Sequence, residues 1–209
     1  MLLGIADANY SFIYVDIGCQ GRISDGGVWK NCTFSTELAN GTLNLPPESP
    51  FLERTKTIPH VFVADDAFPL QNNIMKPYPG EQEKGSKKRI FNYRLCRARR
   101  IIENTFGILS AIFRVLRKPL LLKPESAIII TLSCVYLHNF LRKTQTENTS
   151  ELDGEVIEDT CRAENNQLTS LLPLPIDQTT ARSANDIRDE FSEYFSSDKG
   201  SVPWQNLYA

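Results

Sequence analysis

The chain has 209 residues, 41% of them apolar and 23% charged, an ordinary composition for a soluble protein long enough to form one sizeable hydrophobic core. Its five cysteines are odd in number and include no Cys-x-x-Cys pair, which argues against a disulfide framework or a zinc knuckle and favours reduced thiols in the cytosol or nucleus. The apolar run 127–141 is shorter than the ~20 residues that span a bilayer, so we expect no membrane association.

The net charge of −2 hides a strong asymmetry along the chain. Residues 76–123 hold 13 basic and 3 acidic side chains, whereas residues 144–209 hold 4 basic and 13 acidic ones. A basic block followed by an acidic tail suggests a polyanionic partner. The same pattern is equally compatible with a solvated basic helix that the acidic tail screens, because net charge says little about specific function.

The first predicted elements are two strands, 2–6 and 12–18, joined by a tight turn into a hairpin. The sequence GCQGRISDGGVW follows, and in it either Ser24 or Asp25 can cap a short helix that extends towards residue 31. This glycine-rich stretch fits neither of the common phosphate-binding loops.

A third strand is predicted at 60–65, after a proline-rich and polar loop at 40–57. We expect this strand to join the hairpin strands in one sheet. A long irregular segment, 71–91, follows it and ends in a run of basic residues.

Two long helices are predicted next. In 92–116 apolar or small residues recur at steps of three or four, the helical period. The segment 125–143 is apolar nearly all round, as expected of a helix buried between neighbours. We interpret its His138 as a hydrogen-bonded core residue, since a single histidine on an apolar helix is rarely a ligand.

The remaining chain divides into a linker and a tail. Residues 144–180 are acidic and polar without a sustained period, and we expect them to be disordered. A last helix, 184–196, is predicted to dock on the domain through one apolar stripe, formed by Ile187, Phe191, Tyr194 and Phe195. The predicted organisation is therefore a domain at 1–143, a linker at 144–180 and a C-terminal helix and tail at 181–209.

Paired acids end the third predicted strand, in VFVADDAFPL, residues 61–70. Asp65 and Asp66 are either surface residues at a strand end or the start of a metal site, because a carboxylate at the end of a rigid strand is well placed to hold a cation.

A further acid, Glu103, lies in the arginine-rich part of the predicted helix 92–116. It either pairs within the helix with Arg99 or Arg100, which is worth only ~0.2–0.5 kcal/mol, or shares a divalent cation with Asp65. Mg²⁺ is held by one or two carboxylates together with phosphate oxygens, so acids in a basic surround suit the cleavage of phosphodiesters.

Three stretches carry a resemblance: VFVADDAFPL, NYRLCRARRIIENTFGIL and LSCVYLHNFL. Together they resemble the DDE-type endonuclease domain of PIF/Harbinger transposases and of the nucleases derived from them. The resemblance implies that Asp65, rather than Asp66, is the catalytic aspartate. It also implies that Glu103 is the catalytic glutamate and that the turn ending on Asp25 belongs to the site.

The resemblance implies an α/β fold of the RNase H-like type, a mixed sheet flanked by helices. It implies a divalent cation, Mg²⁺ or Mn²⁺, held by Asp65, Glu103 and Asp25. It further implies a DNA substrate, a Myb-like partner protein of transposase origin and a nuclear location. The basic residues expected to follow DNA phosphates without reading bases are Lys84, Lys87, Lys88, Arg89, Arg94, Arg97, Arg99 and Arg100.

One departure from the family pattern matters. The family's first catalytic aspartate lies in an Asp-Gly motif on the strand before the hairpin, and no such motif precedes strand 2–6. Neither Asp7 nor Asp16 matches that position. We therefore expect a catalytic domain that lacks its first strand.

Three interpretations follow from this departure. The first is a metal-dependent DNA endonuclease, impaired by the missing aspartate. The second is a DNA-binding or protein-interaction module without catalysis, and the third is a non-functional fragment with an exposed sheet edge.

Overall fold

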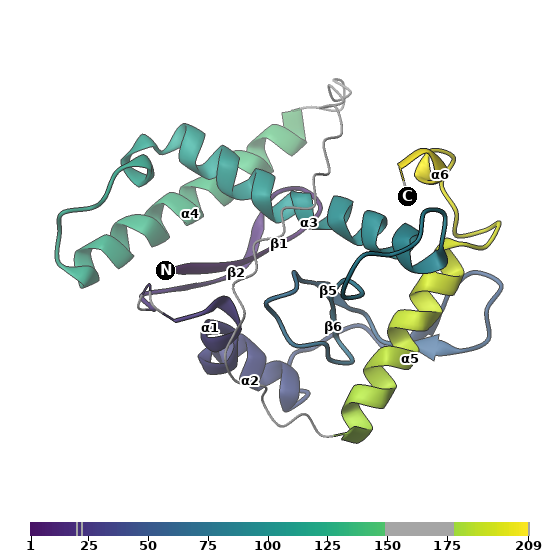
Figure 1. Cartoon of the computed structure of the whole chain (residues 1–209). Helices are drawn as coiled ribbons and strands as arrows, with labels where there is room; N and C mark the ends of the chain where they lie inside the picture. The colour runs from purple at the N-terminus through teal and green to yellow at the C-terminus, as the bar shows by residue number, and fades with distance from the viewer. Residues whose placement is uncertain (20, 22, 149–177, 209) are drawn as a thin grey trace. The chain divides into compact units, whose positions relative to one another are not determined.

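The computed structural model describes residues 1–19, 21, 23–148 and 178–208 (Figure 1). The chain forms two compact units, which are described separately here. The first comprises Met1–Ile23 and Arg100–Leu168, and the second comprises Ser24–Arg99 and Thr169–Ala209. Helix α3 (Lys87–Ile112) contributes residues to both.

The first unit begins with the predicted hairpin. Strands β1 (Leu2–Ala6) and β2 (Phe12–Ile17) pair antiparallel. The turn between them is fixed by the carboxylate of Asp7, whose Oδ1 accepts the backbone N–H groups of Asn9 and Ser11, each at 2.9 Å. An aspartate that bonds the backbone two residues ahead stabilises such turns locally.

Helix α4 (Pro124–Asn148) is joined to the hairpin by a side-chain amide. Asn139 Oδ1 accepts the N–H of Phe12 at 2.8 Å, and its Nδ2 donates to the C=O of Phe12, also at 2.8 Å. One side chain thus pairs with β2 as a neighbouring strand would. The adjacent His138 is fully buried, with its Nε2 2.7 Å from the C=O of Tyr10, which confirms it as a hydrogen-bonded core residue.

The core of this unit lies between the hairpin, α3 and α4. Its buried members are Phe12, Leu109, Cys134 and Val135. Burial raises the pKa of the Cys134 thiol. The hairpin approaches α3 closely, since a Cβ atom on Gly4 would lie 3.0 Å from the ring of Phe106.

Helix α3 is confirmed, with different ends from those predicted. It begins at Lys87 rather than at residue 92, because Ser86 caps it by accepting the N–H of Arg89 at 3.3 Å. It ends at Ile112 rather than at residue 116, since Arg114–Arg117 forms a separate 3-10 turn. The apolar period of the sequence continues through that turn, whereas the α-helix ends before it.

The second unit contains two short sheets. Strands β3 (Ser49–Pro50) and β4 (Thr57–Ile58) pair antiparallel. Strands β5 (Phe62–Val63) and β6 (Ile74–Met75) pair parallel, extended by a hydrogen bond of 2.9 Å from the N–H of Ala64 to the C=O of Met75.

The single sheet predicted from strands 2–6, 12–18 and 60–65 is therefore wrong for the described residues. Their strands form three separate two-stranded sheets. The physical reason is that Phe62 and Val63 have their ladder partners in β6, about a dozen residues downstream, and a sheet is decided by such pairings rather than by strand propensity alone.

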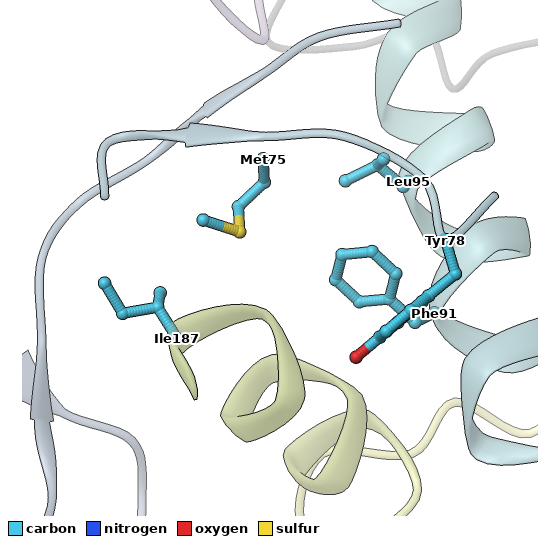
Figure 2. Close-up of a cluster of buried hydrophobic side chains, with 5 residues drawn as sticks. All are labelled: Met75, Tyr78, Phe91, Leu95 and Ile187. Atoms are coloured by element: carbon cyan, nitrogen blue, oxygen red, sulfur yellow. The ribbon is translucent and has the colours of Figure 1, made fainter. Parts of the chain in front are cut away.

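Helix α5 (Gln178–Phe195) docks as predicted. Its Ile187 belongs to one buried hydrophobic cluster with Phe91 and Leu95 of α3 and with Met75 and Tyr78 (Figure 2). The helix begins at Gln178 rather than at residue 184, and α4 runs to Asn148, so both helices extend into the segment predicted to be disordered. Residues 149–177 of that segment lie outside the described residues.

A hydrogen bond anchors α5 to the segment that follows β6. The Tyr78 hydroxyl donates to Asp189 Oδ1 at 2.6 Å. The Arg188 guanidinium lies 4.1 Å from the centroid of the Tyr78 ring. Burial, and secondarily the Asp189 carboxylate, raises the pKa of Tyr78. The docking therefore depends on a neutral tyrosine.

Candidate metal centre and basic surface

Asp65 opens a tight turn immediately after β5. Its Oδ1 accepts the N–H of Ala67 at 2.9 Å, and its C=O lies 3.3 Å from the N of Phe68. Within the described part of the chain, the other carboxylate oxygen has no hydrogen bond. The half-buried side chain is thus oriented by the turn, with one oxygen for a further ligand.

Its neighbour Asp66 has different surroundings. Lys76 Nζ lies 3.0 Å from Asp66 Oδ1 and donates to the Asp66 C=O, also at 3.0 Å. The Asp66 side chain is 74% exposed, where ion pairs contribute little to stability. The geometry therefore separates the two acids: Asp66 closes the loop to Lys76, while Asp65 is not paired with any cation among the described residues.

Helix α1 (Asp25–Asn31) packs directly against the Asp65 turn. Ser24 is its cap, with Oγ accepting the N–H of Gly27 at 3.3 Å, which leaves Asp25 exposed in the first turn. A Cβ atom on Gly26 would lie only 2.7 Å from the C=O of Ala67. The structure thus brings the helix that carries Asp25 against the turn that carries Asp65.

An aromatic cluster holds this contact in place. The buried Trp29 packs edge-on against Phe68 of the turn, with ring centroids 5.8 Å apart. Helix α2 (Thr33–Ala39) adds Phe34, whose ring lies 5.9 Å from Trp29 and 5.2 Å from Phe62 on β5. Because buried aromatic side chains are closely packed, the cluster fixes the turn on a rigid base.

Glu103 lies on α3 within the first unit, and its side chain is exposed. Nearby, Thr105 is fully buried and donates to the C=O of Ile101 at 2.7 Å. Asp65 and Asp25 belong to the second unit. No group of three or more histidine, cysteine, aspartate or glutamate side chains is gathered as a metal site in the described ranges, so the Asp65–Glu103 pair stays a prediction.

The basic residues at the start of α3 differ in how they are held. Lys84, Lys87 and Lys88 are exposed. Arg89 is half-buried and donates to the C=O of Gln82 at 3.3 Å. Lys88 Nζ lies 5.2 Å from the centroid of the Tyr78 ring, whereas the charged groups of Lys84 and Lys87 make no such contact among the described residues.

Arg94 makes its contacts within the protein. Its guanidinium lies 4.1 Å from the centroid of the Phe195 ring and donates to the C=O of Gly200 and, at 3.5 Å, to Gln205 Oε1. Burial lowers its pKa. Gln205, the first residue of α6 (Gln205–Tyr208), is itself buried and donates to the C=O of Phe195 at 2.9 Å. Arg94 thus anchors the C-terminal segment.

Arg97 contacts the same segment. Its guanidinium lies 5.6 Å from the Trp204 ring and donates to the Tyr93 hydroxyl at 3.1 Å. Tyr93 in turn stacks on Tyr208 with an interplanar angle of 14°. In the sequence these arginines belong to a basic block, and their aromatic partners lie about a hundred residues later. The sequence signal for these contacts was the group of aromatic residues near the C-terminus.

Further findings bear on the class of protein. The four described cysteines, Cys19, Cys32, Cys96 and Cys134, form no disulfide. Among the described helices, none combines the length and apolarity needed to cross a membrane.

Comparison with known proteins gives one family. No curated protein and no solved structure matches the chain significantly. A family model described as DDE superfamily endonuclease matches residues 1–139, which include Asp25, Asp65 and Glu103. Because this match covers more than half of the 209 residues, the chain belongs to the DDE endonuclease superfamily.

Proposed function

We propose that the chain is a divalent-metal-dependent DNA endonuclease of transposase origin, from the PIF/Harbinger branch of the superfamily, with Asp65 and Glu103 as its catalytic metal ligands. The observation that carries the proposal is the family match, which spans both motifs. The RNase H-like arrangement of the complete domain is part of the same proposal.

The local geometry fits a hard cation at Asp65. One carboxylate oxygen is fixed by the N–H of Ala67, and the other has no hydrogen bond within the described ranges. Asp25, which is exposed, supplies a second carboxylate from the helix packed on the same turn. Oxygen ligands of this kind are those that Mg²⁺ and Mn²⁺ prefer.

A bound divalent cation would lower the pKa of an attacking water and offset charge on the scissile phosphate. The turn after β5 keeps the Asp65 carboxylate in one orientation, and α1 packs against that turn at Gly26. Holding a ligand to a fraction of an ångström matters, since a 1 Å error can reduce the rate about a hundredfold.

DNA is the proposed substrate, and Lys84, Lys87 and Lys88 are its proposed phosphate contacts. Their side chains are exposed, whereas Arg94 is anchored to the C-terminal segment. Arg89, Arg97, Arg99 and Arg100 complete the basic surface as secondary contacts. A nuclear location and a Myb-like partner accompany this proposal, as the family resemblance implies.

A second candidate function is a DNA-binding module without catalysis. One observation favours it: no three metal-binding side chains gather among the described residues.

Plasmid nicking in Mg²⁺ separates the two functions. The 209 residues alone are expected to nick supercoiled DNA weakly or not at all. The same chain preceded by a strand with the family's Asp-Gly motif is expected to nick it, and Asp65→Ala or Glu103→Ala should abolish that activity. Asp66→Ala is the matched control and should leave it unchanged.

Two outcomes would contradict this account. If the extended chain binds DNA and still does not nick it, the module without catalysis is the correct function. If the 209 residues alone nick strongly, and Asp65→Ala removes the activity, the third ligand comes from within the chain, with Asp25 the first candidate.

A further inference from the structure

One face of helix α4 carries large apolar side chains that are exposed. The inward residues Cys134, Val135 and His138 are buried. On the outward face, four large apolar side chains are each more than half exposed: Ile129 at 64%, Tyr136 at 71%, Leu137 at 51% and Phe140 at 63%. Single exposed apolar residues are common, but several on one helix face indicate a contact surface.

The exposed face corrects one expectation from the sequence. The segment 125–143 is apolar nearly all round and was predicted to lie buried between neighbours. Within the first unit, the hairpin and α3 cover one side of α4. The apolar residues of the other side are exposed and form a surface on which a partner can pack.

The order of the residues along the outward face suggests the partner. Six exposed residues recur there at helical steps of three or four and form a stripe: Glu125, Ile129, Ser133, Tyr136, Phe140 and Lys143. The stripe begins with an acid and ends with a base. Its small residue and its tyrosine lie on either side of the midpoint.

We propose that this stripe of α4 binds the same stripe of a second copy, with the two helices antiparallel. Rotating the stripe about its midpoint places Glu125 opposite Lys143 of the other copy. The same rotation places Ile129 opposite Phe140 and Ser133 opposite Tyr136. Every residue thus meets a complementary one, as a two-fold interface requires.

Ser133 can be buried at the centre of the interface without leaving its hydroxyl group unpaired. Ser133 Oγ donates to the C=O of Ile129 at 2.8 Å, so its hydrogen bond is satisfied inside its own helix. Its small side chain leaves room for the Tyr136 ring of the other copy. A large residue at this position would hold the two helices apart.

Charge selects the antiparallel orientation. Two parallel copies would place Glu125 beside Glu125 and Lys143 beside Lys143, and like charges across an interface are unfavourable. Antiparallel copies replace both repulsions with two attractions. The proposal depends on neither metal nor DNA, so it stands or fails independently of the nuclease function.

Sedimentation velocity of the 209-residue chain, free of DNA and metal, tests the proposal over a range of concentrations. The chain is expected to form a dimer. Lys143→Glu and Glu125→Lys should each weaken dimerisation about tenfold, since each places like charges opposite one another. The double variant Glu125→Lys/Lys143→Glu should restore it, because both attractions return with their signs exchanged.

Two controls complete the test. Lys84→Glu makes the same charge change outside the stripe and should leave the dimer intact. Phe140→Ser removes the apolar end of the stripe and should give a monomer, with circular dichroism used to show that it is folded. A chain that is monomeric at all concentrations, or a dimer that neither the charge variants nor Phe140→Ser weakens, would overturn the proposal.

Discussion

Glycine at position 26 is required by a backbone contact at the candidate metal centre. The carbonyl of Ala67 occupies the space that a Cβ atom would take, at 2.7 Å. Because the obstructing atom belongs to the backbone, a larger residue must displace either α1 or the Asp65 turn. The glycine therefore sets the distance between the segments that carry Asp25 and Asp65.

Gly26→Ala is expected to destabilise the second unit by about 1–3 kcal/mol. The measurement is urea unfolding followed by Trp29 fluorescence, since Trp29 is buried beside the turn. Gly107→Ala is the control, because Gly107 is helical with open space around it and should be neutral or slightly stabilised. Equal effects of the two variants would contradict the close approach.

Tyr78 gives the stability of the second unit a defined pH dependence. Its pKa is raised above the ordinary value of 10.0 by burial and by Asp189. A group whose folded pKa is raised contributes stability that is complete below the unfolded pKa and is lost as pH rises through the folded one.

Tyr78→Phe is therefore expected to cost about 1 kcal/mol at neutral pH, because Asp189 loses its hydrogen-bond donor. The difference in the free energy of unfolding between wild type and variant should shrink as pH rises above 10. Urea unfolding at a series of pH values measures it. A difference that is constant through this range would show that the tyrosine does not titrate with unfolding.

At the scale of elements, local signals predicted the helices better than the sheets. The apolar period of α3, the stripe of α5 and the Asp7 turn of the hairpin are all encoded within a few residues. The helix end at Ile112 was missed because the period continues into the 3-10 turn that follows. Local patterns therefore give an element's type more reliably than its limits.

These local patterns did not predict contacts between residues that are distant in the sequence. Nothing near Phe62 indicates that its strand pairs with β6 alone. Nothing near Arg94 indicates that Gly200 and Gln205 take up its guanidinium. The candidate acids were visible in the sequence pattern, and the resemblance favoured Asp65 over Asp66. The physical difference between these two acids became visible only with the Lys76 ion pair. Such pairings depend on residues distant in the sequence.

Asn139 provides a test at the scale of elements, because its side chain joins α4 to β2 with two hydrogen bonds. Asn139→Ala is expected to leave the N–H and C=O of Phe12 without partners and to destabilise the first unit by about 2–3 kcal/mol. Hydrogen exchange should show faster exchange of the Phe12 amide. Asn104→Ala, on the exposed side of α3, should change neither quantity.

At the scale of the whole molecule, the family match contains all the candidate acids. Residues 1–139 match the DDE endonuclease superfamily. Within them, Asp65 is positioned by a turn that α1 and an aromatic cluster support. Its neighbour Asp66 is paired with Lys76. Our central proposal is that Asp65, and not Asp66, is a metal ligand of this protein.

Mn²⁺ binding, followed by the loss of the free-ion signal in electron paramagnetic resonance, tests that proposal most directly. The wild-type chain is expected to bind Mn²⁺ weakly, and Asp65→Asn to weaken binding at least about tenfold, as expected when a ligand is lost. Asp66→Asn should bind as the wild type does. Loss of binding in Asp66→Asn with retention in Asp65→Asn would contradict the account.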